Sequence, residues 1–192
     1  MGTSQAEKAI SHDRILDIAS AQIRRDGIDS LRVADLMQEA GLTTGGFYRH
    51  FDSREQLVAA ATQRAMSQGS EWTVASGHVG GRPGYVALVD GYLSPWHRDH
   101  PEAGCGVAAI AADASRRSGS TQTTYTRQVK ECLAVIADLA DDPDHELAQR
   151  EAVLTLSVLV GAISIARAVD DPDLSQSILA DAAAALKERP PN

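Results

Sequence analysis

The stretch that decides the fold is residues 31–57, with the sequence LRVADLMQEAGLTTGGFYRHFDSREQL. Its first part repeats apolar residues at spacings of three and four, which places them on one face of a helix. These residues are Val33, Leu36, Met37 and Ala40. Gly41 follows directly, at the point where a helix that ends in the left-handed conformation favours a residue without a Cβ. The pattern predicts a short helix and a tight turn.

A second short helix is expected after this turn, with the hydroxyl of Thr43 as its cap. Phe47 and Phe51 are four positions apart and are expected to face inward together. The residues left on the other side are small or carry hydrogen-bond donors: Thr44, Gly45, Tyr48, Arg49 and His50. A helix with such a front fits the major groove of DNA, so the segment predicts a helix-turn-helix. The spacing alone fits equally well an ordinary helical hairpin in an all-α core.

The wider block from residue 10 to about residue 66 resembles the DNA-binding domain of the tetracycline-repressor (TetR) family. That family has an Ile/Leu-Ala-x-x-Ala-Gly-Val/Leu-Ser/Thr turn and then a short recognition helix ending in Tyr-x-x-Phe. The matching segments here are LMQEAGLT at residues 36–43, GGFYRHF at 45–51 and DSREQL at 52–57. Two positions depart from the pattern. Arg32 stands where the family has a capping Thr or Ser, and Gly46 stands where a bulkier residue is usual, which predicts a less rigid recognition helix.

The resemblance implies which side chains contact DNA, and the expected set is Arg32, Thr43, Thr44, Gly45, Tyr48, Arg49, His50 and Arg54. Three of them are expected to hold phosphates, namely Tyr48, His50 and Arg54. Another three are expected to approach base edges, namely Thr44, Gly45 and Arg49. Arg32 is expected to exchange the missing cap for a phosphate contact.

The overall charge argues against a nucleic-acid binder. The chain has 18 Lys and Arg against 26 Asp and Glu, a net charge of −8. Residues 1–66 carry 8 basic and 9 acidic side chains, whereas residues 67–192 carry 10 and 17. The acidity therefore lies mainly in the C-terminal part, and Arg32, Arg49 and Arg54 can still supply a local phosphate-binding patch. We expect an affinity for DNA that depends strongly on salt.

The remaining elements are all predicted to be helical, so the fold class is all-α. Helices are expected at about residues 11–26, with Ser11 as N-cap, 54–70, 85–100 with a break at Pro95, 104–117, 121–139, 145–169 and 173–188. Asp142-Pro143 and Asp171-Pro172 are expected to start the last two. The glycine-rich segment 77–84 is a break. The expected domains are an N-terminal three-helix helix-turn-helix DNA-binding domain at 10–70 and a C-terminal helical ligand-binding and dimerisation domain at 71–192.

The helix expected at 145–169 is apolar on almost all sides, which a domain this small rarely buries within one subunit. With the helix at 173–188 it predicts a homodimer through four helices, as the resemblance to the TetR family also implies. A central helix in a monomer is the alternative. The same run reaches the length of a membrane span, but acidic clusters flank it and Lys/Arg flanks are missing. With no signal peptide at the N-terminus, a cytoplasmic protein without membrane contact is expected.

The resemblance also implies a ligand cavity in the C-terminal domain. The candidate ligand-binding residues are Trp72, Tyr92, Trp96, Cys105 and Tyr125, each of which also suits an ordinary core. Cys105, at an expected helix start, suits either a redox-sensing thiol or, more simply, a small buried residue. His97 and His100 are three apart, but no further ligand is spaced to complete a metal site, so both are expected to be solvent-exposed.

These features predict a homodimeric, ligand-responsive transcriptional regulator, most simply a repressor that a small-molecule effector releases from a palindromic operator in double-stranded DNA. No catalytic or cofactor motif is present, so no enzyme activity, catalytic residue, metal or cofactor is expected. One alternative is a helical small-molecule-binding protein, or a thiol-based sensor through Cys105, with weak or vestigial DNA binding. The acidity and Gly46 favour that alternative. Another is a helical enzyme, which no specific feature favours.

Overall fold

The computed structural model describes residues 5–76, 78–79, 82–140 and 144–188, with side chains described at 5–69, 84–139 and 144–188. Its helices are α1 (Gln5–Asp26), α2 (Val33–Glu39), α3 (Arg54–Ser76), α4 (Tyr85–Tyr92), α5 (Pro95–Asp99), α6 (Gly106–Ser115), α7 (Ser120–Ala140), α8 (His145–Ala168) and α9 (Pro172–Glu188). Three short 3₁₀ helices are η1 (Ile28–Ser30), η2 (Thr44–Arg49) and η3 (Pro101–Ala103). β1 (His78–Val79) and β2 (Arg82–Pro83) form a two-residue antiparallel ladder that the sequence pattern did not predict. The all-α fold class is confirmed.

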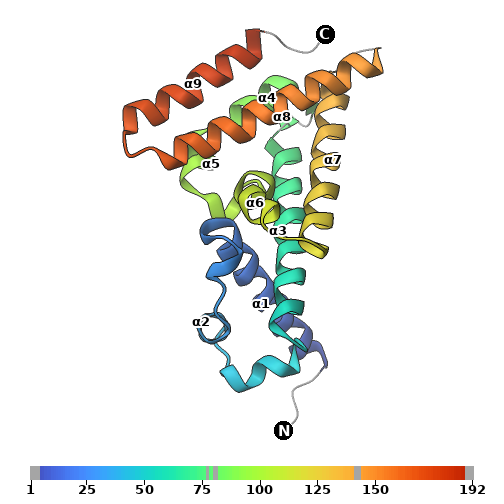
Figure 1. Ribbon diagram of the computed structural model, residues 1–192, viewed down its shortest axis with the longest axis vertical. Helices are drawn as coiled ribbons and strands as arrows, with labels where there is room; N and C mark the ends of the chain where they lie inside the picture. The colour runs from blue at the N-terminus through green and yellow to red at the C-terminus, as the bar shows by residue number, and fades with distance from the viewer. Residues whose placement is uncertain (1–4, 77, 80–81, 141–143, 189–192) are drawn as a thin grey trace.

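Different helices form the two ends of the molecule (Figure 1). α1, α2 and η2 form the lower end, whereas α8 and α9 lie across the upper end. α3 runs from one end to the other, packed against α1 in the lower part and against α7 in the upper part. The buried apolar residues form one cluster at each end, and α6 contributes Ile110 to the lower cluster and Val107 to the upper one. α3 and α6 therefore connect the two ends, because each packs against elements of both.

The first helix is longer than predicted. α1 begins at Gln5, so Ser11 lies inside the helix and the prediction that it is the N-cap was wrong. Gln, Ala, Glu and Lys, which fill residues 5–9, are good helix formers and extend the helix without any burial. The predicted end is confirmed, because α1 stops at Asp26 and Gly27 has a φ of 84°.

The predicted helix starts and breaks were right in two places and wrong in one. Ser94 Oγ accepts a hydrogen bond from His97 N at 3.1 Å and so starts α5 after the break before Pro95. Asp171 caps α9, with Oδ1 accepting hydrogen bonds from the backbone N–H groups of Asp173 and Leu174 at 3.0 and 3.1 Å. α8 is instead capped by Asp144, which accepts hydrogen bonds from two backbone N–H groups. Asp142 and Pro143, the predicted start, lie outside the described residues.

The backbones of α3 and α6 approach each other at a pair of glycines. A Cβ added to Gly69 would collide with the backbone nitrogen of Gly106 and lie 3.2 Å from the carbonyl carbon of Cys105. A Cβ added to Gly106 would lie 2.8 Å from Met66 Sδ and 2.9 Å from Ala65 O. Because most of these atoms belong to backbone, neither contact can be relieved by a side-chain rotation. The two glycines therefore allow the close approach of α3 and α6.

We therefore expect Gly69→Ala to lower the free energy of unfolding by about 3 kcal/mol, in spite of the better helix propensity of alanine. Gly45→Ala is the matched control, because a Cβ at Gly45 meets no atom within 4 Å. Urea denaturation followed by circular dichroism measures both variants. Equal stability of the two variants would show that α3 and α6 can move apart without cost.

Candidate nucleic-acid interface

The helix-turn-helix predicted at residues 31–57 is present. α2 buries Leu36 and Met37, and Gly41 adopts a φ of 73° in the turn that follows, as predicted. The rings of Phe47 and Phe51 are 3% and 2% exposed and stack on each other with centroids 5.6 Å apart. The recognition segment is therefore fixed to the core through its two aromatic side chains, and its other side is free to meet a partner.

The recognition segment is a 3₁₀ helix, η2, because its hydrogen bonds span three residues rather than four. Gly45 and Gly46 lie in its first turn, where two residues of poor helix propensity weaken an α-helix. Thr43 occupies the N-cap position, but its hydroxyl makes no capping hydrogen bond, so that part of the prediction was wrong. Arg32 stands at the N-cap of α2 and likewise makes no side-chain cap there. Both side chains are exposed.

The predicted DNA-binding residues gather at one end of the molecule. Seven of them are exposed: Arg32, Thr43, Thr44, Gly45, Tyr48, Arg49 and Arg54. Tyr48 is the most prominent, with a 76% exposed side chain whose ring meets that of Phe47 edge-on at 5.3 Å. Arg54 Nη2 donates a hydrogen bond to Leu31 O at 3.1 Å and so braces the start of α2. A large aromatic side chain exposed to this degree on a rigid base suits a contact with another molecule.

The predicted set of DNA contacts included no residue of α1. Because α1 begins at Gln5, Lys8 and Ser11 reach the recognition segment and line a groove of about 550 Å³ together with Thr43, Tyr48, Arg49 and His50. Lys8 adds a positive charge beside Arg49 at this end. The signal that could have revealed it is the run of helix-forming residues before Ser11, which extends the helix back toward the recognition segment.

His50 is the one predicted contact that is partly buried. Burial lowers its pKa, and the positive charges of His12, Lys8 and Arg49 lower it further. The His12 ring stacks on Phe51 at 4.7 Å and lies 6.3 Å from the His50 ring. Among the described residues, His50 Nδ1 has no hydrogen-bond partner.

The sequence of this domain matches a known family. The family described as "Bacterial regulatory proteins, tetR family" matches residues 15–61, which include the helix-turn-helix and the start of α3. This match identifies residues 15–61 as similar to the DNA-binding domain of the TetR family. The predicted all-α fold is confirmed, and the predicted resemblance to the TetR family is confirmed over these residues. No curated protein matches the whole sequence significantly.

Solved structures of TetR regulators share the fold over nearly the full chain. A TetR transcriptional regulator from Chloroflexus aurantiacus superposes with a TM-score of 0.78 at 22% identity, covering 96% of this chain and 98% of its own. A TetR regulator from Cytophaga hutchinsonii gives 0.76 at 16%, with 98% of both chains covered. Reduced NemR from E. coli gives 0.73 at 16%, covering 93% and 96%. The similarity of fold therefore includes the C-terminal helices as well as the DNA-binding domain.

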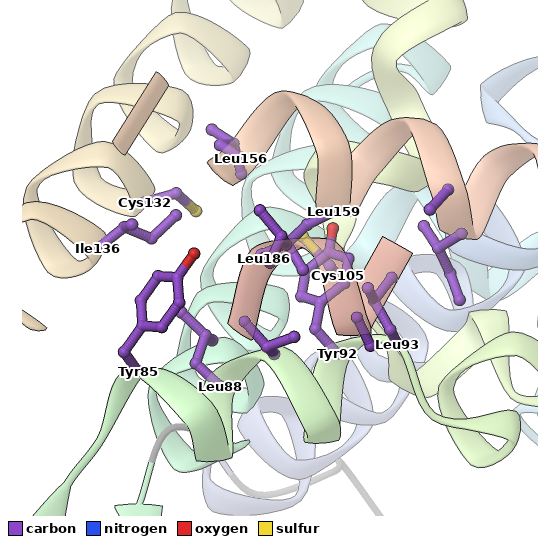
Figure 2. Packing of buried hydrophobic residues seen from close by; sticks show 14 of the residues in the cluster. Tyr85, Leu88, Tyr92, Leu93, Cys105, Cys132, Ile136, Leu156, Leu159 and Leu186 are labelled. Atoms are coloured by element: carbon purple, nitrogen blue, oxygen red, sulfur yellow. The ribbon is translucent and has the colours of Figure 1, made fainter. Parts of the chain in front are cut away.

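The structure separates the five predicted ligand-binding residues. Tyr92 and Cys105 are buried at 0% and 2% exposure in the upper apolar cluster, where Figure 2 shows them beside Leu159. Tyr125 is half-buried, and its hydroxyl donates to Val107 O at 3.3 Å. Trp96 lies apart, 46% exposed and stacked on His100 at 4.9 Å. The side chain of Trp72 lies outside the described part of the chain.

His97 contradicts the expectation that it is solvent-exposed, because its side chain is 0% exposed. Cys105 N donates a hydrogen bond to His97 Nε2 at 3.1 Å, so Nδ1 carries the ring proton and donates to Tyr92 O at 2.7 Å. Burial, reinforced by the charge of Arg167, lowers the His97 pKa to about 4 although the bond to Tyr92 opposes this shift. The neutral ring ties the end of α4 to the start of α6. Over the described residues, no group of three His, Cys, Asp or Glu side chains is arranged to hold a metal.

Proposed function

We propose that this protein is a cytoplasmic, homodimeric repressor of the TetR family that binds a palindromic operator and leaves it when a small molecule binds the C-terminal domain. The observation that carries the proposal is the exposed recognition segment on its buried Phe47–Phe51 base. Arg32, Arg49 and Arg54 surround it and provide phosphate contacts, while Thr44, Gly45 and Arg49 are the residues proposed to reach base edges.

The apolar surface of α8 and α9 supports the proposed dimer. Leu154 and Ile165 are 51% and 54% exposed, and Leu174 at the start of α9 is 47% exposed. Leu147, Leu154, Val158 and Ile165 repeat at spacings of seven, four and seven, so they form one stripe along α8. α8 is also the one described helix whose length and hydropathy would suit a membrane span, with only 39% of that window buried in the single chain. A second copy packed on this stripe would cover it through four helices.

The proposed effector site is the upper apolar cluster, where Tyr92, Cys105 and Tyr125 lie on α4, α6 and α7. Tyr92 and Cys105 are fully packed, so a ligand that enters between them would have to displace α4 or the start of α6. Because α6 also packs in the lower cluster through Ile110, such a movement would reach the DNA-binding domain. The leverage of the ligand equals its differential affinity for the two arrangements.

The first experiment is a selection of operator sequences from random DNA duplexes by the purified protein. We expect enrichment of an inverted repeat whose half-sites are about one helical turn apart or a multiple of it, because a dimer presents two recognition segments. The affinity for the selected duplex should fall steeply with salt, since phosphate contacts release counterions. Absence of any enriched sequence would instead favour a small-molecule-binding protein with vestigial DNA binding, which the net charge of −8 also favours.

The substitution Tyr48→Ala should weaken binding of the selected operator about 50-fold, since each of the two recognition segments loses one contact of about 1 kcal/mol or somewhat more. The fold should be unaffected, because the side chain is 76% exposed. Fluorescence anisotropy measures the affinity, and thermal denaturation checks the fold. Trp96→Ala, which removes an exposed aromatic side chain from α5, is the control. Operator binding that survives Tyr48→Ala would refute the assignment of this segment to the DNA contact.

A further inference from the structure

A groove separates the DNA-binding domain from the C-terminal helices and is not among the predicted sites. It has a volume of about 750 Å³ and is lined by residues of α1, α5, α6, α8 and α9. Its charged lining residues are Arg24, Arg25, Arg98, Arg167, Asp99 and Asp170. Arginines therefore outnumber carboxylates in the lining of this groove, although the chain as a whole is strongly acidic.

Two of these arginines are held by neutral acceptors. Arg24 is 7% exposed, and its Nε donates to Glu102 O at 2.6 Å while Nη1 donates to Ala65 O at 3.2 Å and Gln68 Oε1 at 3.0 Å. Arg167 Nε donates to Arg98 O at 3.2 Å, and its Nη2 donates to His97 O. These acceptors satisfy several N–H groups, but carbonyl and amide oxygens carry no negative charge to balance a guanidinium.

The positive charge of both side chains is consequently balanced only at a distance, by Glu102 and Asp17 for Arg24 and by Glu102 and Asp99 for Arg167. Among the described residues, neither Arg24 nor Arg167 forms an ion pair with a carboxylate, whereas Arg25 pairs with Asp26 at 2.9 Å and Arg98 with Asp99 at 2.7 Å. Burial lowers the pKa of Arg24 and of Arg167, and the nearby carboxylates offset only part of this shift. Buried charges in proteins are as a rule paired or ligand-bound, because an isolated charge in a poorly solvated site is costly.

We propose that this groove binds a small organic polyanion, whose carboxylate or phosphate groups pair with the arginines of α1 and α8. The bonds described above leave Arg24 Nη2 and Arg167 Nη1 as donors for an oxyanion, and a guanidinium binds carboxylate and phosphate oxygens equally well. A volume of about 750 Å³ is that of an ordinary small-molecule site. Ala108 and Ala109 also line the groove, and their small side chains leave room for the carbon skeleton of the ligand.

The position of the groove gives its ligand a means of regulation, an inference that rests on the proposed function. Arg24 belongs to α1, which carries the DNA-binding domain, and Arg167 belongs to α8, which carries the proposed dimer face. An anion held by both would fix the DNA-binding domain relative to the dimer helices and so set the distance between the two recognition segments. Operator affinity would then change with anion concentration. The size of the change would depend on how differently the anion binds the operator-binding arrangement and the released arrangement.

Binding is tested by isothermal titration calorimetry of the full-length protein at constant ionic strength, with pyrophosphate and citrate as probes. We expect saturable binding of at least one probe, which also distinguishes phosphate from carboxylate recognition. Arg25→Ala should weaken it about tenfold, because a charge-assisted contact is lost without disturbing the buried Arg24 or the half-buried Arg167. Asp170→Asn should strengthen it severalfold by removing an opposing charge from the lining.

Arg127→Ala is the matched control, because the Arg127–Glu131 ion pair is as exposed as the Arg25–Asp26 pair but lies on α7, outside the lining of the groove. Lack of saturable binding of both probes at millimolar concentration would overturn the proposal, and so would an equal effect of Arg127→Ala and Arg25→Ala.

Operator affinity is measured separately, with and without the probe that binds. A bound probe with unchanged operator affinity would leave the anion site in place and remove its regulatory consequence. A protein that binds the probe but no DNA would contradict the proposed function alone.

Discussion

The double substitution Leu154→Glu with Ile165→Glu is expected to make the protein monomeric and to weaken operator binding about a thousandfold or more. Both residues lie on the exposed stripe of α8, three helical turns apart, with half of each side chain exposed in the single chain. In a symmetric dimer each glutamate would enter the interface twice. Burial of unpaired carboxylates costs several kcal/mol, which is enough to dissociate an interface of this kind at micromolar concentration.

Loss of DNA binding follows from loss of the second recognition segment. A single DNA-binding domain offers Lys8 and the arginines at positions 32, 49 and 54 as its basic contacts, and residues 1–66 have no net positive charge. Its affinity for a half-site is therefore modest. In a dimer the second contact is intramolecular and takes place at a high effective concentration. A monomer loses this advantage entirely. Dissociation of the dimer should therefore lower operator affinity more than the loss of any single side chain in the recognition segment.

Sedimentation equilibrium and fluorescence anisotropy on one preparation test both parts of this prediction. The control is Val86→Glu, which introduces the same charge at a residue that is 49% exposed on α4, outside the apolar stripe of α8. That variant should remain dimeric and bind operator normally. A wild-type protein that sediments as a monomer, or a double variant that stays dimeric, would exclude the α8–α9 interface.

The features that the sequence predicts correctly are those decided by neighbouring residues. Gly41 ends α2 because the turn needs a positive φ, and Asp171 starts α9 because its side chain reaches N–H groups two and three positions away. Phe47 and Phe51 share a face because they are four apart in one short helical segment. Each of these local features follows from spacing, and the resemblance to the TetR family then distinguished a helix-turn-helix from an ordinary helical hairpin.

The features it does not predict depend on partners far along the chain. Arg24 donates to the carbonyl of Glu102, 78 positions away, and Arg167 to that of Arg98, 69 positions away, so the basic groove has no local signature. The cap of α8 was assigned to Asp142 instead of Asp144 because two nearby aspartates can cap equally well in sequence. His97 was misjudged because a histidine between Trp96 and Arg98 beside a proline resembles a surface residue. The ring is buried only because the backbone of Tyr92 and Cys105 converges on it.

That buried ring should make the stability of the protein depend on pH. The folded-state pKa of His97 is lowered from 6.5 to about 4, so the folded protein keeps the ring neutral where the unfolded chain already binds a proton. The contribution of His97 to stability is therefore complete above about pH 6.5 and declines as the pH falls toward 4, because the unfolded state binds more protons over that interval. Between about pH 7.5 and pH 5 the free energy of unfolding should fall by about 2 kcal/mol through this residue alone.

The variant His97→Gln isolates that contribution from the other titrating groups. A glutamine cannot be protonated, so the variant is expected to be less stable than wild type at pH 7.5, through imperfect hydrogen bonds to Tyr92 O and Cys105 N, but to lack the decline. The difference in stability between wild type and His97→Gln should consequently narrow by about 2 kcal/mol from about pH 7.5 to pH 5 in urea titrations at equal protein concentration. His100→Gln, at an exposed ring three residues away, should keep the wild-type pH dependence. If the difference in stability between wild type and His97→Gln stayed constant over this range, the folded protein would protonate His97 as readily as the unfolded chain does. The assignment of a neutral His97 bridge between α4 and α6 would then be wrong.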